Sequence, residues 1–206
     1  MEKHEPAIPA GGGSWRYYLR RGIGQARIES RFIRNHFWRN VLAGSGLCPM
    51  LLRWLLLRVS GLQLRTINIR EDCKIHNSHL SVGSNSTIGR GCFFEGSGQI
   101  KIGDFTQVGP DCTFITSNHE IWLDSGQLQR SRGVSEDIVV GSRVWLGTRV
   151  TVLPGSEIPN DTVVAAGAVV RGSLKSGHVY GGIPARPIRE LSSEVPATKD
   201  NVGGRP

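Results

Sequence analysis

The sequence predicts an all-β solenoid with triangular coils, and three features of the chain support this prediction. Between Val82 and Val170, apolar anchor residues recur mostly at intervals of six. A small or β-branched residue often follows an anchor by four places, and glycine directly follows several anchors. A period of six is too short for a helical repeat but fits one short strand and a turn. Three such units would close one triangular coil.

Twelve anchors carry the pattern, and two interruptions divide it. The anchors are Val82, Ile88, Phe94, Ile102, Val108, Phe114, Val140, Leu146, Val152, Ile158, Val164 and Val170. A short interruption covers residues 95–101, and a long one covers residues 115–139. We expect each anchor to point inward, where burial of one aliphatic side chain contributes roughly 1.5–3 kcal/mol. Gly, Asn and Asp between the anchors should supply the turn conformations, some with positive φ.

The spacing of the four cysteines gives little support to a metal or disulfide framework. They stand at positions 48, 73, 92 and 112, without any C-x-x-C pair. Cys92 and Cys112 occupy the small-residue position of the repeat, which predicts packing inside the coils. The sequence therefore predicts no metal centre built on thiols.

Charge is concentrated at the N-terminal end of the chain. The net charge is +8 over 206 residues. Residues 1–60 hold ten Lys and Arg against Glu2, Glu5 and Glu29, which gives +7, whereas residues 61–206 give +1. A basic segment of this kind fits a membrane surface, an anionic partner or a solvated helical face. Nucleic acid is not expected, because the repeat region is nearly neutral and carries no nucleic-acid-binding motif.

Composition and periodicity predict four segments. Residues 1–14 are expected to be a disordered N-terminus, and residues 15–70 a basic, partly helical segment. Residues 71–189 are expected to form the solenoid with its loop at 115–139, and residues 190–206 a tail. No apolar run is long enough to span a bilayer, and no secretory signal is visible. We expect a cytoplasmic protein, with residues 15–60 as a candidate for peripheral contact with the inner face of the membrane.

Two stretches resemble the hexapeptide-repeat acyltransferases, namely I-G-D-F-T-Q-V-G-P-D-C-T from Ile102 and V-G-S-R-V-W-L-G-T-R-V from Val140. The closing V-V-A-A-G-A-V-V-R and Y-G-G-I-P-A-R-P-I are similar to the C-terminal signature of that family. The resemblance covers roughly residues 75–190 and points to the branch of galactoside, maltose and xenobiotic acetyltransferases. It implies a left-handed parallel β-helix, acetyl-CoA as cosubstrate, no required metal and a homotrimer with active sites between prisms.

His119 is the residue that the resemblance implies as catalytic base. It follows F-I-T-S at the start of the long interruption, as the base does in the family. A neutral imidazole can take the proton from an acceptor hydroxyl and return it to the departing thiolate, so that no covalent enzyme intermediate is needed. Glu120, Asp124 or a backbone carbonyl would orient the ring. The alternative is that His119 has only a structural role at the end of the loop.

The resemblance also implies the binding residues. The expected CoA contacts are Trp145, Gly147, Thr148, Ala166, Gly167, Arg171, Arg186 and Arg189, the arginines facing the phosphates. Gly172 follows Arg171 where relatives often have lysine, so one expected phosphate contact is missing. Glu95 and Asn118 are the candidates for binding the acceptor.

Three functional hypotheses follow from these residues. The leading one is O-acetylation of a sugar or glycan hydroxyl, in polysaccharide or lipid-linked glycan assembly. The alternatives are O-acetylation of an antibiotic and a non-catalytic scaffold role. A zinc enzyme is not expected, because no pair of histidines has ligand spacing within the repeats.

Overall fold

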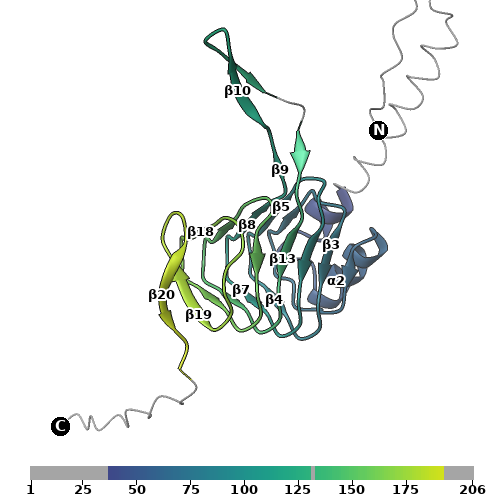
Figure 1. Ribbon diagram of the computed structural model, residues 1–206. Helices are drawn as coiled ribbons and strands as arrows, with labels where there is room; N and C mark the ends of the chain where they lie inside the picture. The colour runs from purple at the N-terminus through teal and green to yellow at the C-terminus, as the bar shows by residue number, and fades with distance from the viewer. Residues whose placement is uncertain (1–36, 131–132, 193–206) are drawn as a thin grey trace, which may run out of the picture.

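The computed structural model describes residues 37–130 and 133–192, and its body is a parallel β-helix with three faces (Figure 1). The predicted solenoid with triangular coils is therefore confirmed. The predictions for residues 1–14 and for most of the tail lie outside the described residues. No helix in the described ranges is both long and apolar enough to cross a bilayer.

Each face of the prism is a sheet to which successive coils add one parallel strand, and the antiparallel strand β20 extends the second face. The first face contains β1 (Gln63–Leu64), β3 (Leu80–Val82), β6 (Ile100–Ile102), β13 (Ile138–Val140) and β16 (Glu157–Ile158). The second contains β4 (Thr87–Ile88), β7 (Gln107–Val108), β14 (Trp145–Leu146), β17 (Val163–Val164), β19 (His178–Gly181) and β20 (Arg186–Glu190). The third contains β2 (Lys74–Ile75), β5 (Phe93–Glu95), β8 (Thr113–Ile115), β15 (Thr151–Val152) and β18 (Val169–Val170).

Three columns of turns join these faces. The first corner leads from the first face to the second, the second corner from the second face to the third, and the third corner from the third face back to the first. The long interruption leaves the prism at the third corner, between β8 and β13. It contains β9 (Ser117–Asn118), β10 (Ile121–Asp124), β11 (Gln127–Arg130) and β12 (Val134–Ser135). The β10–β11 hairpin projects away from the prism as an arm (Figure 1).

The anchors form the core. All twelve are buried, each at most 3 % exposed. Anchors in successive coils pair directly, as Ile102 does with Val140 and Val108 with Leu146. The rings of Phe94 and Phe114 stack with centroids 4.9 Å apart. Each coil thus buries its apolar side chains against the coils on either side, as a solenoid requires.

Gly, Asn and Asp between the anchors do supply turns with positive φ, for example at Asn85, Gly91 and Asp111. The glycines that directly follow an anchor have a second role, which the sequence analysis did not identify; they are Gly83, Gly89, Gly103, Gly109, Gly141 and Gly147. None of these six glycines has positive φ. Instead, their corners stack so closely that a Cβ would collide with the next coil: a Cβ on Gly109 would lie 2.7 Å from the carbonyl carbon of Gly147. Positive φ occurs two residues later, at positions such as Asn85, Phe105 and Asp111. Glycine is therefore needed for close approach, and the left-handed turn residue is often not glycine.

The solenoid begins ahead of the boundary expected at residue 71. β1 pairs with β3 in parallel, and Ile69 forms a bridge with Ile88. The inward residues of this first coil are Leu64, Ile69 and Ile75, all buried. Their spacing is irregular, with a step of five from Leu64 to Ile69 and a step of six to Ile75, so the count of six did not reveal this coil.

Helical and hairpin segments lie at the two ends of the prism. The helices η1 (Phe37–Leu42) and α2 (Met50–Val59) lie at the N-terminal end, where Leu57 is buried in the core. The antiparallel pair β19–β20 lies at the other end (Figure 1). The expected helical content of the N-terminal segment is thus present in its described part.

Candidate active site

The long loop leaves and re-enters the third corner through a short antiparallel ribbon. Asn118 in β9 pairs with Val134 in β12. His119 follows directly, and its backbone N–H donates to Oδ1 of Asn118 over 2.8 Å. A Cβ on Gly133 would lie 3.7 Å from Cε1 of His119, so the imidazole lies beside this glycine across the ribbon. The side chain of His119 is exposed at the base of the arm.

Serine hydroxyls hold this ribbon to the coil below, and the sequence analysis did not identify them. The Oγ atoms of Ser97 and Ser135 lie 2.7 Å apart, and those of Ser117 and Ser135 lie 3.3 Å apart. The backbone N–H of Glu136 also donates to the carbonyl of Thr116. These contacts fix where the loop starts and ends. Ser97 and Ser117 lie one coil apart at the same corner, and this repetition of serine is the sequence feature that could have identified the contact.

Glu95 lies at the same corner as His119, one coil earlier. It is paired with Ile115 in the third face, and its carbonyl accepts a hydrogen bond from the backbone N–H of Thr116. Its side chain is exposed. The two predicted acceptor-binding residues, Glu95 and Asn118, are therefore brought to the corner that carries the predicted base.

Most of the predicted CoA contacts gather on the second face and second corner. Trp145 projects outward from β14 and is 56 % exposed. The corner after it contains Gly147 and Thr148, whose hydroxyl donates to the carbonyl of Pro110. In the next coil the same corner contains Ala166 and Gly167, and a Cβ on Gly167 would meet nothing within 4 Å. The aromatic side chain thus stands next to a shallow edge made of small residues.

The predicted phosphate contacts divide into two groups. Arg171 and Arg186 both line a cavity of about 290 Å³ at the C-terminal end of the prism, together with His178 and Tyr180. Arg189 is exposed on β20, opposite Val179, and does not line this cavity. Two of the three arginines therefore share one recess.

His119 and Trp145 cannot meet within one prism. His119 is attached at the third corner, where the third and first faces join, and Trp145 stands on the second face. In a triangular prism, that corner and that face are opposite each other. A site that contains both side chains therefore needs a second copy of the chain.

The core cysteines are packing residues, as predicted. Cys73, Cys92 and Cys112 are buried and stacked in successive coils, and each thiol donates to a glycine carbonyl of the next coil. Contacts with the thiols of Cys112 and Cys73, together with burial, raise the pKa of Cys92 above its ordinary value. Cys92 therefore stays a neutral thiol, which is a poor nucleophile.

The histidines near the start of the solenoid have structural neighbours. His76 packs edge-on against Phe93, and Nδ1 of His79 lies 3.1 Å from the carbonyl oxygen of Ser97. Among the described residues, no three His, Cys, Asp or Glu side chains gather closely enough to hold a metal ion.

Comparison with known proteins places the chain in a family. No family model matches it. Over 157 residues it is 31% identical to WbbJ of Escherichia coli K12, which bears the name of a lipopolysaccharide biosynthesis O-acetyl transferase, and the match covers 62% of this chain and 80% of WbbJ. The chain belongs to the hexapeptide-repeat acetyltransferases.

Other relatives agree with this assignment. The E. coli K12 galactoside O-acetyltransferase is 29% identical over 123 residues, covering 55% of this chain and 58% of that protein. The hexapeptide-repeat acetyltransferase VCA0836 of Vibrio cholerae, solved with acetyl-CoA, superposes with a TM-score of 0.67 at 25% identity. That match covers 81% of this chain and 90% of VCA0836. This hexapeptide-repeat acetyltransferase is therefore an acetyl-CoA-dependent acyltransferase.

Proposed function

We propose that the protein transfers an acetyl group from acetyl-CoA to a hydroxyl of a sugar or glycan, with His119 as general base. One observation carries the proposal: His119 is exposed at the corner where the loop leaves the prism, and Glu95 and Asn118 lie at the same corner. The kinship with WbbJ and galactoside O-acetyltransferase supports a sugar acceptor. The scaffold hypothesis has no support, because these relatives are named as transferases.

His119 would act by direct proton transfer. Acetyl-CoA supplies the acetyl group as a thioester. As the acceptor oxygen bonds to the acetyl carbon, His119 takes the hydroxyl proton, and it returns that proton to the sulfur as the carbon–sulfur bond breaks. A backbone N–H of a neighbouring coil would stabilise the transient oxyanion. No cysteine is required, in keeping with the neutral, buried thiol of Cys92.

The second corner fits the cosubstrate. Gly147 and Ala166 leave the stacked turns without projecting side chains, so a slender pantetheine arm can lie along them. Trp145 would form one wall of that channel. Arg171 and Arg186 would hold phosphate groups at the cavity that they line, since a guanidinium matches phosphate geometry. Arg189 would contribute from β20, the strand that also carries Arg186.

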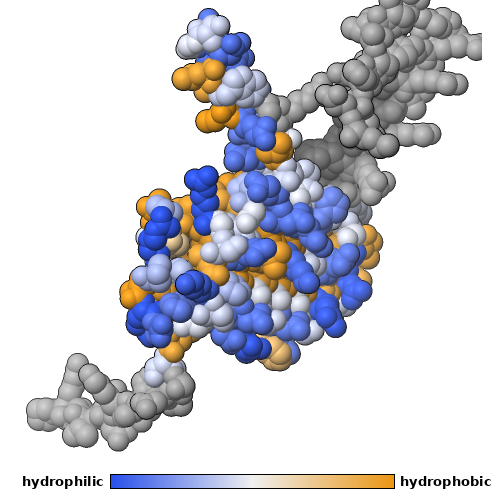
Figure 2. Space-filling model, in the orientation of Figure 1, coloured by the Kyte–Doolittle hydropathy of each residue, from blue (hydrophilic) through white to orange (hydrophobic). Residues whose placement is uncertain are grey.

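We also propose a homotrimer in which neighbouring chains share each site. The opposite placement of His119 and Trp145 supports this assembly. The projecting arm supports it too, since it exposes Ile121, Leu123 and Leu128, each about two-thirds or more accessible. Figure 2 shows hydrophobic side chains on the arm, away from the body of the prism. Apolar side chains on an unsupported hairpin are typical of a surface that packs against another chain.

The test of the base is His119→Ala. We expect kcat to fall by about two to four orders of magnitude, while the trimer and CoA binding persist. Turnover would be followed by thiol release from acetyl-CoA with a panel of sugars, nucleotide sugars and hydroxylated antibiotics. His79→Ala, an exposed histidine two coils away at the same corner, is the matched control and should keep full activity. Unchanged turnover in His119→Ala would remove this residue as base, and turnover only with antibiotics would favour the xenobiotic alternative.

The shared site has a separate test. His119→Ala and Trp145→Ala chains, each impaired alone, would be co-expressed so that mixed trimers form. Because a site then takes its imidazole from one chain and its indole from the next, about a quarter of randomly assembled sites regain both groups. Measurable recovery supports sharing between chains. Activity no higher than that of the single variants would place both residues in one chain's site or in none.

A further inference from the structure

In helix α2 a charged side chain is buried and several apolar side chains are exposed, which is the reverse of the pattern expected for a helix that faces water. Arg53 is 4 % exposed, and its guanidinium donates to the carbonyls of Ala43, Ser45, Cys48 and Ile69 over 2.8–3.2 Å. Leu51, Leu55 and Val59 are 66 %, 49 % and 79 % exposed. Because these three residues are spaced by four, they form one stripe along the outer surface of the helix. We call them the α2 stripe.

The apolar surface extends beyond the α2 stripe. Leu47, one turn before the helix, is 95 % exposed, and Leu52 on the helix is 47 % exposed. A contiguous apolar surface of this kind marks an interaction site, because its exposure to water is unfavourable and burial against a partner would remove that cost. The question is which partner covers it.

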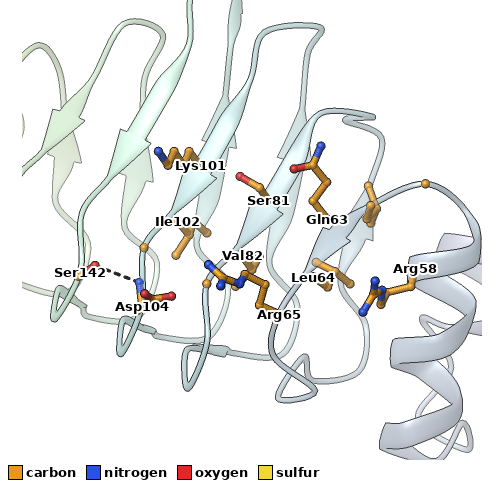
Figure 3. Close-up of a pocket in the computed structure, with 14 residues that line it drawn as sticks. Arg58, Gln63, Leu64, Arg65, Ser81, Val82, Lys101, Ile102, Asp104 and Ser142 are labelled. Atoms are coloured by element: carbon orange, nitrogen blue, oxygen red, sulfur yellow. Dashed lines mark hydrogen bonds between the residues drawn. The ribbon is translucent and has the colours of Figure 1, made fainter.

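The surroundings of the α2 stripe are cationic. Residues 37–70 contain five arginines and no acid, although Arg39 and Arg53 are buried and Glu71 lies 3.8 Å from the Arg53 guanidinium. Two of these arginines, Arg58 and Arg65, are exposed and join Lys101 in lining a cavity of about 590 Å³ beside the end of α2 (Figure 3). The one acid in this lining is Asp104, whose Oδ1 already accepts the backbone N–H of Ser84. We call Arg58, Arg65 and Lys101 the basic groove.

We infer that the α2 stripe and the basic groove together bind the surface of an anionic lipid bilayer. A stripe of leucines enters the interface while the neighbouring cations meet lipid phosphates, which is the pattern of an interfacial helix. At ten residues, α2 is too short to span the membrane, so it lies on the surface. This inference does not depend on the identity of the acetyl acceptor.

Charge argues against the two other occupants. A second copy of α2 would bring Arg58 and Arg65 against their own equivalents. The N-terminal residues 1–36 hold seven Lys and Arg against three Glu, a net charge of +4, and would also meet like charge. An anionic bilayer is the partner that satisfies both the leucines and the arginines.

The position of α2 suits such docking. It lies at the N-terminal end of the prism, whereas β19 and β20 lie at the other end (Figure 1). A bilayer against α2 therefore leaves the second corner and the C-terminal cavity accessible.

Vesicle flotation of the full-length protein tests the inference. The vesicles would contain either phosphatidylcholine alone or equal parts of phosphatidylcholine and phosphatidylglycerol. We expect binding to the anionic vesicles only, weakened by salt. L51Q/L55Q should lower the partition coefficient at least about tenfold, and R58E/R65E at least about twentyfold, from roughly fivefold for each charge. I188Q/L191Q, two exposed aliphatic residues at the opposite end, is the control and should bind like the wild type.

Several outcomes would overturn the inference. They are the absence of binding to anionic vesicles, equal binding by L51Q/L55Q and the wild type, or loss of binding in R20E/R21E with full binding in both α2 variants. A smaller assembly for L51Q/L55Q than for the wild type, measured by light scattering without lipid, would instead identify the α2 stripe as a contact between copies. Thermal melts of each variant verify that the fold is intact.

Discussion

Replacing Gly109 by alanine tests the claim that glycine follows the anchors because successive corners touch. The new Cβ would lie 2.7 Å from the carbonyl carbon of Gly147 and 2.8 Å from its oxygen and from the nitrogen of Thr148. All three are backbone atoms, so no side chain can swing away. Ordinary contact requires the two corners to separate by about 0.7 Å. That shift stretches the 2.8 Å hydrogen bond from the N–H of Gly109 to the carbonyl of Leu146.

The magnitude follows from two opposing terms. Overpacking of this kind destabilises the folded protein by about 1–3 kcal/mol. Alanine has less conformational freedom than glycine in the unfolded chain, which stabilises the folded protein by about 0.4–1 kcal/mol. The net loss of about 1–2 kcal/mol should lower the Tm by about 2–8 °C in a chain of this size. Since Thr148 lies in the displaced corner, the KM for acetyl-CoA should rise as well.

Gly46→Ala is the matched control for this measurement. Gly46 does not have positive φ, and a Cβ there would meet nothing within 4 Å. This variant should melt at the wild-type temperature or slightly above it. If thermal melts by circular dichroism give the same Tm for Gly109→Ala and Gly46→Ala, the corners are not stacked as described and the reasoning fails.

Three further predictions concern single side chains. Trp145→Ala should raise the KM for acetyl-CoA with little change in Tm, because the indole projects outward from the second face; an unchanged KM in steady-state kinetics would exclude it from the channel. Arg53→Met should lower the free energy of unfolding by about 3 kcal/mol or more, since buried carbonyls lose their donor, and Arg58→Met should cost far less in the same urea titration. Arg143, hydrogen-bonded to Asp161, holds the pKa of that carboxyl below its ordinary value. This contribution is present above the ordinary pKa and is lost as pH falls through the lowered one, so the difference in Tm between wild type and Asp161→Asn should shrink as the pH is taken below the ordinary carboxyl pKa of about 3.9.

The coils could be predicted from the sequence because the signal is local. An inward side chain recurs every six residues wherever a strand and a turn have standard length, as from Val140 to Val170. The prediction stopped at the first coil, where Leu64, Ile69 and Ile75 follow irregular spacings. It also missed the close approach of the glycines that follow the anchors, because the stacking of Gly109 on Gly147 depends on residues 38 positions apart.

The candidate site could be predicted only in part. His119 and the residues of the second corner could be proposed because short motifs mark them. The serines that hold the loop were missed, since Ser97, Ser117 and Ser135 have no motif and meet only when the coils stack. That His119 and Trp145 lie on opposite sides of one prism follows from how the three faces close.

The sequence by itself determined the triangular coil, its core residues and the loop that interrupts it. In a short repeat, the near neighbours of each residue decide whether it points into the core or lies in a turn. Only the tertiary structure decided which side of α2 faces the protein. Residues 50–59 are apolar on nearly every side, so the pattern of the helix does not select a buried face. The face of Arg53 is buried because its guanidinium donates to backbone carbonyls from outside the helix, and the face that carries Leu51 and Leu55 is therefore exposed.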